Sequence, residues 1–405
     1  MANNLLTPDM ILREAQFILH QKLNFVGNII RDYDDSFANE GGKIGNTLRI
    51  RMPLQYATGT GATMATGTGA DSQETQVTLT VNSQRHVPMR FTSNELTMKV
   101  EDFSSRHIEP AMAILAAKIE NDAFNMVDEV AQAVNAGTAV AFSEIMEGRT
   151  KLANSLAPSQ DRYAILDPQA NADLVGELKG LFHDGMEIKR QYKDGMMGRT
   201  AGFDFFENTL IDGHTCGAAA GAVTPYYLTN SATAQVGSYT NMNSMSLIVD
   251  TGTATVKEGD VFTIADVNRV HPESKTDTGE LMQFTVLADF TGAGTITVSP
   301  AIIATGPYQN CTNGAANDKQ LTFIGTASTA FKQSLLFQKG FAVMGTADLV
   351  MPNGVDFKAR RVYDGISMRL IRDYDIVKDR ILCRIDVLYG YKVLRPQLAC
   401  KIWHT

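Results

Sequence analysis

The sequence predicts an α+β protein in which a module made of β-strands interrupts the mixed part of the chain. Apolar residues recur at steps of three and four over residues 7–32 and 104–135, which is typical of amphipathic helices. From Gly217 to about Thr329 the chain is rich in Thr, Ser, Gly, Ala and Asn, and its short apolar runs indicate strands. Strongly alternating strands return at 366–370 and 381–389, so we expect the C-terminus to complete the sheet of the mixed part.

Composition limits the class of protein. The chain has 405 residues, of which 44% are hydrophobic and 20% charged, as in a folded globular protein. We expect no secretory signal and no membrane span, because no apolar run approaches the ~20 residues that a spanning helix needs. The four cysteines are far apart, which favours buried thiols in a reducing cytoplasm. If the protein meets nucleic acid, the net charge of −8 and the dispersed basic residues favour enclosing it over gripping it.

The first elements are a helix and a hairpin. We expect the helix to run from 7 to 32, with Thr7 as N-cap and Pro8 at the first helical position. Two alternating segments, 47–52 and 76–81, then flank a tip in which Thr58-Gly-Thr-Gly-Ala62 recurs as Thr66-Gly-Thr-Gly-Ala70. Such a tip cannot bury a core, so a long projecting hairpin is predicted.

A long helix is predicted next, from about 104 to 135, with its start nearer Glu109 because Pro110 suits a first turn. At 25–30 residues it would be about 40 Å long and would serve as a spine for an extended subunit. Residues 141–200 mix helices with a short buried strand at 163–166. The all-β stretch that follows, residues 217–330, is called the β-module below.

The sequence predicts no enzyme, no cofactor and no metal site. The Gly-rich tip lacks the Lys and the following helix of a phosphate-binding loop. His183-Asp184 and Asp212-Gly213-His214 place a histidine beside a carboxylate, but no nucleophile motif accompanies them, which favours a surface or loop role. The basic run at 189–193 favours a solvated helix face or a subunit contact over a nucleic-acid patch.

One polar stretch of the β-module carries both signs of charge between two strands. This charged segment, 268–280, is predicted to be a long loop, and long ordered loops are often functional. It is interpreted either as a mobile surface loop or as a salt-bridging contact with a neighbouring subunit. Its charged residues are Arg269, Glu273, Lys275, Asp277 and Glu280.

The order of these parts resembles the capsid fold that tailed phages share with herpesviruses. Three segments are similar to coat proteins of the short-tailed Salmonella phage (P-twenty-two) group. Arg199-Thr-Ala-Gly-Phe-Asp204 resembles the stretch before that family's insertion. Lys257-Glu-Gly-Asp-Val-Phe-Thr-Ile264, Val267-Asn268, Gln283-Phe-Thr-Val286 and Ser299-Pro300 resemble its inserted domain. Cys383-Arg-Ile-Asp-Val-Leu-Tyr-Gly390, with Arg395-Pro396, resembles its terminal strand.

The resemblance implies a tailed-phage capsid fold with an inserted small β-barrel domain. Its parts would be an N-terminal arm (1–45), an extended hairpin (46–90), a spine helix of the peripheral domain (91–137), a first axial part (138–216), the inserted domain (217–330), a second axial part (331–355) and peripheral C-terminal strands (356–405).

The resemblance also implies a function and partners. Such a protein would form pentamers and hexamers of an icosahedral shell, first as a precursor around a scaffolding protein and then as an expanded head enclosing double-stranded DNA. A portal protein would occupy one vertex. The hairpin would lie over a neighbouring subunit, and the charged segment would reach the next capsomer. Asp9 and Glu14 would contact the scaffolding protein. We expect assembly in the host bacterial cytoplasm and a final location in the virion.

Two other functions remain open at this point. An encapsulin-type compartment would use the same fold to enclose a cargo enzyme, although encapsulins resemble the compact fold without an insertion. A phage tail or receptor-binding protein would suit the Thr/Gly-rich β half, although the long helix is unusual for that class.

Overall fold

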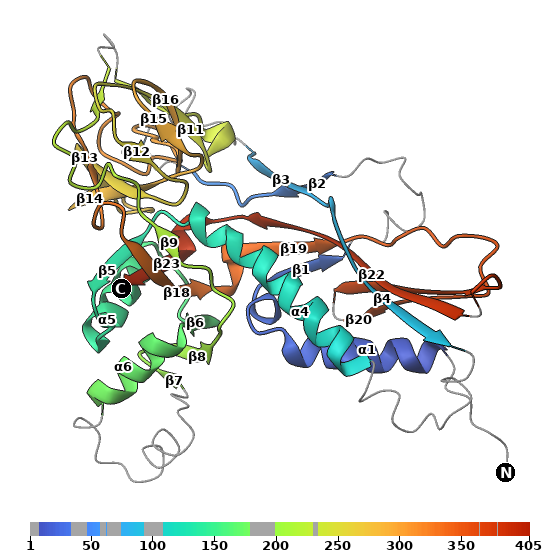
Figure 1. The fold of residues 1–405 in the computed structure, drawn as a ribbon. Coiled ribbons are helices and arrows are strands. Elements are labelled where there is room, and N and C mark those ends of the chain that lie inside the picture. Colours follow the sequence, from blue (N-terminus) through green and yellow to red (C-terminus); the bar gives the residue numbers. More distant parts are fainter. Residues whose placement is uncertain are drawn as a thin grey trace. The chain divides into compact units, whose positions relative to one another are not determined.

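The computed structural model describes residues 8–33, 47–56, 62, 74–92, 108–178, 199–229, 234–363, 365–378 and 380–405. By its internal contacts the chain divides into two units. Unit 1 comprises 1–49, 78–124 and 342–392, and unit 2 comprises 50–77, 125–341 and 393–405. Helices and strands are mixed in both, so the predicted α+β class is confirmed (Figure 1).

Unit 1 is built on a six-stranded sheet. Strand β22 lies between β4 and β21, with which it pairs antiparallel, while β1 at the sheet edge pairs parallel with β19. The predicted alternation over 381–389 is confirmed, because Cys383, Ile385, Val387 and Tyr389 are all buried. The strands are β1 (Ile30–Tyr33), β4 (Ser83–Thr92), β19 (Ala342–Thr346), β20 (Phe357–Tyr363), β21 (Ile366–Asp375) and β22 (Arg380–Val393).

Two helices cover this sheet, α1 (Pro8–Lys22) and α4 (Glu109–Phe124). The predicted end of the first helix, near residue 32, is wrong. The chain leaves α1 at Lys22, forms the short 3₁₀ helix η1 (Val26–Asn28) and enters β1, where Ile30 pairs with Val343. Pairing with β19 therefore overrides the helical spacing of the last apolar residues.

The predicted spine helix is also shorter than expected. Helix α4 has 16 residues, about 24 Å at 1.5 Å per residue, rather than about 40 Å. A 3₁₀ helix, η4 (Asn125–Glu129), follows it, and Ala133–Gly137 forms strand β5. The helix-like apolar spacing extends to residue 134 because Val130 and Val134 are buried here, as they would be in a helix. A short apolar run cannot by itself distinguish a helix from a buried strand.

Unit 2 contains a seven-stranded sheet in the order β5-β23-β18-β6-β8-β7, with β9 also paired to β18. All six residues of the C-terminal strand β23 are buried between β5 and β18. The predicted buried strand at 163–166 is confirmed as β6. The elements are α5 (Phe142–Asn154), α6 (Pro168–Leu178), β6 (Arg162–Leu166), β7 (Arg199–Thr200), β8 (Phe203–Glu207), β9 (His214–Thr215), β18 (Ala330–Gln338) and β23 (Ala399–His404).

The β-module of unit 2 has its own six-stranded sheet, ordered β10-β11-β16-β14-β13-β17. Leu228 N donates to Lys319 O (3.0 Å), and Leu321 N donates to Tyr226 O (2.9 Å), so the first and last strands also join. The sheet therefore closes into a small barrel. Its strands are β10 (Tyr227–Leu228), β11 (Met245–Asp250), β13 (Val261–Val270), β14 (Asp277–Val286), β16 (Gly294–Ser299) and β17 (Leu321–Phe323).

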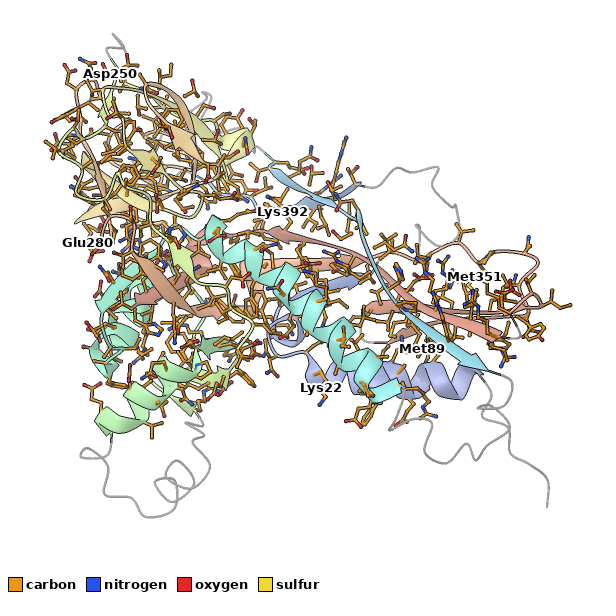
Figure 2. All side chains as sticks on the ribbon, viewed as in Figure 1. Lys22, Met89, Asp250, Glu280, Met351 and Lys392 are labelled. Carbon is orange, nitrogen blue, oxygen red and sulfur yellow. The ribbon has the colours of Figure 1, made fainter. Side chains whose placement is uncertain are left out.

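The barrel encloses a separate apolar core. Leu247, Phe262, Phe284 and Val298 are fully buried in it, each from a different strand. Burying such side chains supplies the main driving force for folding, since each is worth roughly 1.5–3 kcal/mol. Figure 2 shows the dense packing of side chains in the module, with Asp250 and Glu280 on its surface.

The remaining elements are short. Strands β2 (Thr47–Arg51) and β3 (Gln76–Thr80) form the stem of the predicted hairpin, whose Thr/Gly tip lies outside the described residues except for Ala62. The other short elements are β12 (Thr255–Val256), β15 (Phe290–Thr291), η5 (Tyr239–Asn241), η6 (Lys339–Phe341) and η7 (Pro396–Leu398). In the described ranges, no helix has both the length and the apolar character needed to span a bilayer.

Candidate functional site

The charged segment is a β-hairpin rather than the long loop that the sequence predicted. Strand β13 continues to Val270 and β14 begins at Asp277. These two residues pair directly, so the turn is limited to 271–276. His271 N donates to Thr276 O (2.9 Å) and Lys275 N donates to His271 O (2.9 Å). Sequence reasoning missed this because polar residues at an exposed strand end look like a loop.

Two cations of the charged segment, Arg269 and Lys275, have partners within the same chain. Arg269 Nη2 lies 3.1 Å from Glu280 Oε2, and its Nη1 is 3.4 Å from Ser155 Oγ on the chain after α5. Lys275 Nζ donates to Gln309 O at 3.1 Å. Burial lowers the pKa of both Arg269 and Lys275, because removal from water disfavours the charged form. The contacts of these two cations therefore stabilise the hairpin itself.

The acids of the charged segment differ from one another. The Asp277 carboxylate accepts hydrogen bonds from Gly279 N (2.8 Å) and Asn268 Nδ2 (3.1 Å), and these bonds lower its pKa. Glu273 lies in the exposed turn, and its carboxylate has no hydrogen-bond or ion-pair partner among the described residues. Glu273 is thus the charge of this segment most available to another molecule.

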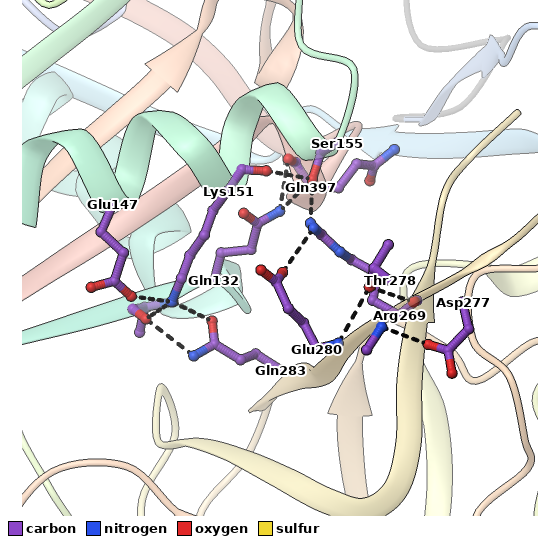
Figure 3. A network of polar contacts seen from close by, with 12 residues as sticks. Gln132, Glu147, Lys151, Ser155, Arg269, Asp277, Thr278, Glu280, Gln283 and Gln397 are labelled. Carbon is purple, nitrogen blue, oxygen red and sulfur yellow. Dashed lines mark hydrogen bonds and ion pairs between the residues drawn. The ribbon is translucent and has the colours of Figure 1, made fainter.

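The base of the hairpin is tied to the seven-stranded sheet by Gln283 of β14. Its amide oxygen accepts from Ala133 N (3.0 Å), and its amide nitrogen donates to Ala133 O (3.1 Å). Lys151 of α5 also donates to Ala133 O (2.7 Å) and pairs with Glu147 (3.3 Å). Figure 3 shows this network beside the Arg269–Glu280 pair. Arg269, Lys151 and Gln283 together line a cleft of about 910 Å³.

A second polar cluster surrounds His214, for which the sequence favoured a surface or loop role. That prediction is wrong, because His214 is buried in β9 and bonds to Asp260 rather than to Asp212 (Nε2 to Oδ1, 2.8 Å). Its ring stacks on Trp403 with centroids 5.2 Å apart. Asp260 also accepts from Gly217 N (3.1 Å) and Lys257 N (2.8 Å). The carboxylate therefore joins the segment that follows β9 to the turn at 257–260.

Three side chains of this cluster could in principle ligate a metal, since ligand atoms of His214, Cys216 and Asp260 lie within 4.8 Å of one another. Burial raises the pKa of the Cys216 thiol to about 12, so the thiol is neutral at physiological pH. Asp260 is already bonded to the backbone, and the ammonium of Lys401 is nearby. The chemistry favours a hydrogen-bonded core cluster over a metal centre.

The predicted scaffolding contacts lie on α1. Glu14 is exposed, next to Arg13 and on the same side of the chain as the 55% exposed Phe17. Asp9 belongs to α1, but its side chain is outside the described residues. His183, Asp184 and the basic run at 189–193 also lie outside them.

Sequence reasoning missed Lys401, Asp260 and Gln283. A signal existed for Lys401, because it is a charged residue in the middle of an otherwise apolar strand, Cys400-Lys-Ile-Trp403. No local signal existed for Gln283, whose partners are distant in sequence.

The chain is similar in sequence to a family of phage coat proteins. The family model described as P22 coat protein, gene protein 5, matches residues 31–401. A curated major capsid protein from Acyrthosiphon pisum secondary endosymbiont phage 1 is 23% identical over 253 residues. That match covers 59% of this chain and 60% of the relative, so it spans less than two thirds of the relative's length.

Solved structures of phage capsids are also similar. A chain from Mycobacterium phage Che8 matches with a TM-score of 0.48 and 10% identity, covering 94% of this chain and 90% of its own. A chain of the bacteriophage PhiM1 mature capsid matches with a TM-score of 0.45 and 10% identity, covering 95% and 87%.

Proposed function

Because this chain belongs to the P22 coat protein family, we propose that it is the major capsid protein of a tailed phage. The observation that carries the proposal is the extent of the family match, which spans both units rather than one module. The protein has a structural role, in which pentamers and hexamers of the chain close into an icosahedral shell. The match to a phage coat family favours this function over a compartment that encloses an enzyme.

The shell forms first as a precursor around a scaffolding protein, with a portal protein at one vertex. It then expands into a head filled with double-stranded DNA. Assembly takes place in the host bacterial cytoplasm and the protein ends in the virion. The net charge of −8 supports enclosure of DNA without tight binding, since tight binding needs clustered cations that neutralise phosphates.

The tip of the charged segment contacts the neighbouring capsomer. Glu273 supports this role because it is exposed and charged, whereas Arg269 and Glu280 already pair with each other. The ion pair between Arg269 and Glu280 stabilises the hairpin. The hydrogen bonds of Asp277 and Lys275 restrict the conformation of its turn. A preorganised hairpin loses less conformational entropy when it binds.

The exposed side of α1 contacts the scaffolding protein through Glu14 and Asp9. The charge of Glu14 and the apolar surface of Phe17 are both accessible. A basic amphipathic segment would complement this combination.

Sedimentation tests the proposal. Expressed with a candidate scaffolding protein, the chain should sediment as particles far larger than its 44.1 kDa monomer. Sedimentation as monomers or small oligomers under these conditions would contradict the proposed function.

A charge reversal tests the capsomer contact separately. Glu273→Lys should leave the monomer folded but reduce the yield of particles, because only a contact between subunits is changed. Asp318→Lys is the matched control, an exposed acid elsewhere on the β-module. Equal yields from both variants would remove Glu273 from the contact.

A further inference from the structure

The C-terminal strand β23 lies beside the turn that leads into the first long strand of the β-module. The central residue of β23, Lys401, is fully buried. Its Nζ donates to Gly259 O at 2.7 Å and lies 5.0 Å from the centroid of the Trp403 ring. A residue near the end of the chain is thereby bonded to a turn 142 positions earlier.

Four titratable groups near Lys401 favour the charged form of its side chain. Asp128 comes from η4, Asp260 from the turn, Cys216 from the chain after β9, and Cys400 from β23 itself. The carboxylates favour the ammonium, whereas burial opposes it and lowers the pKa of Lys401 to about 8. Burying a charge without partners costs free energy. An arrangement that removed these groups from Lys401 would therefore be disfavoured.

The turn that Lys401 contacts has little freedom to move. Gly259 has a φ of +89°, and a Cβ at this position would lie 2.7 Å from Asp128 Oδ1. Gly259 N donates to Val286 O (2.8 Å), and Thr285 Oγ1 donates to Asp128 O (2.9 Å). The turn therefore contacts both β14 of the module and η4 of the rest of unit 2.

We infer that Lys401 is a positioning residue, and that the C-terminal strand acts as a strap that holds the β-module in one orientation on the seven-stranded sheet. The chain connects the module to the sheet at two places only, near 216 and near 330. By themselves, two adjacent connections would allow a hinge, and the bonds of Gln283 to Ala133 and of Thr285 to Asp128 already restrict it. The bond from Lys401 to Gly259 is an additional tie, made by a segment that follows the module by about 70 residues and belongs to neither connection.

Distances between spin labels on the full-length monomer test the strap. One label replaces Asp318, exposed on the module, and the other replaces Glu177, exposed on α6. The four native cysteines are buried and should remain unlabelled. We expect a narrow distance distribution in the otherwise unchanged chain and one at least twice as broad in Lys401→Met. A distribution of equal width in both would overturn the inference.

Lys332→Met is the matched control. Lys332 lies on the adjacent strand β18, but it is exposed and pairs with Asp167 at 3.5 Å. The distribution of distances between the two labels in Lys332→Met should be as narrow as in the otherwise unchanged chain. Equal broadening in both lysine variants would overturn the inference, because it would mean that any loss of charge on this sheet loosens the module.

Hydrogen exchange provides a local readout. In Lys401→Met, amides of the turn at 257–260 should exchange at least tenfold faster, whereas those of the barrel core strands β11 and β16 should not change. Uniformly faster exchange would show general destabilisation and contradict a strap.

Lys401→Gln serves if Lys401→Met does not fold. Its shorter side chain keeps a polar group in the interior but loses the bond to Gly259 O, so amides of the turn at 257–260 should exchange about threefold faster. Unchanged exchange at 257–260 in this variant would then overturn the inference.

Discussion

A buried carboxylate in unit 1 offers a quantitative test of the fold. Asp386 of β22 is completely buried and accepts hydrogen bonds from Arg369 Nη2 (2.8 Å) and Arg384 Nε (2.6 Å). Arg369 is itself largely buried. Asp386→Asn removes the charge but almost none of the volume, and it leaves the Arg369 guanidinium without its counter-ion. Breaking a buried ion pair in this way costs about 3–5 kcal/mol.

The matched control for this prediction is Asp356→Asn. Asp356 pairs with Arg372 at 3.1 Å, but both side chains are substantially exposed, and such a pair is worth about 0–1 kcal/mol. Urea unfolding followed by circular dichroism should give a clearly lower midpoint for Asp386→Asn and nearly no change for Asp356→Asn. Equal shifts in the two variants would refute the burial argument.

Two further predictions concern packing and pH. A Cβ on Gly390 would lie 2.1 Å from Thr80 O, so Gly390→Ala should lower the free energy of unfolding by about 1–3 kcal/mol. Thermal unfolding should show the loss, whereas Gly176→Ala, in an open position of α6, should be neutral or stabilising. His404 is buried, and burial lowers its pKa below 6.5. Its contribution to stability is therefore fully present above pH 6.5 and is lost as the pH falls through the lower folded-state pKa. Urea midpoints should fall between pH 7 and pH 5, and His404→Leu should reduce that dependence; an identical dependence would contradict this.

The sequence predicted well the elements whose pattern is local. Alternation identified β22, because one buried face requires a period of two, and short apolar runs identified four strands of the β-module. The end of α1 and the identity of β5 could not be predicted, since both depend on pairing with strands more than 250 residues away. Tertiary pairing decided between two conformations that the local pattern allowed equally.

The candidate site was predictable only in its location. The concentration of charged residues at 268–280 marked this segment in the sequence. The residues that Arg269 and Lys275 contact, such as Ser155 and Gln309, are distant in sequence, and no local pattern marks them. Lys401 illustrates the same limit. Its position in an apolar strand marked it as unusual, yet nothing local showed that it contacts Gly259.

Electron microscopy of the chain expressed with a candidate scaffolding protein tests the central claim most directly. A shell protein should give uniform closed particles with icosahedral symmetry, in which each β-module lies at a boundary between capsomers. Dispersed monomers or small oligomers, even at high protein concentration and with scaffolding protein present, would contradict the assignment of this chain as a major capsid protein.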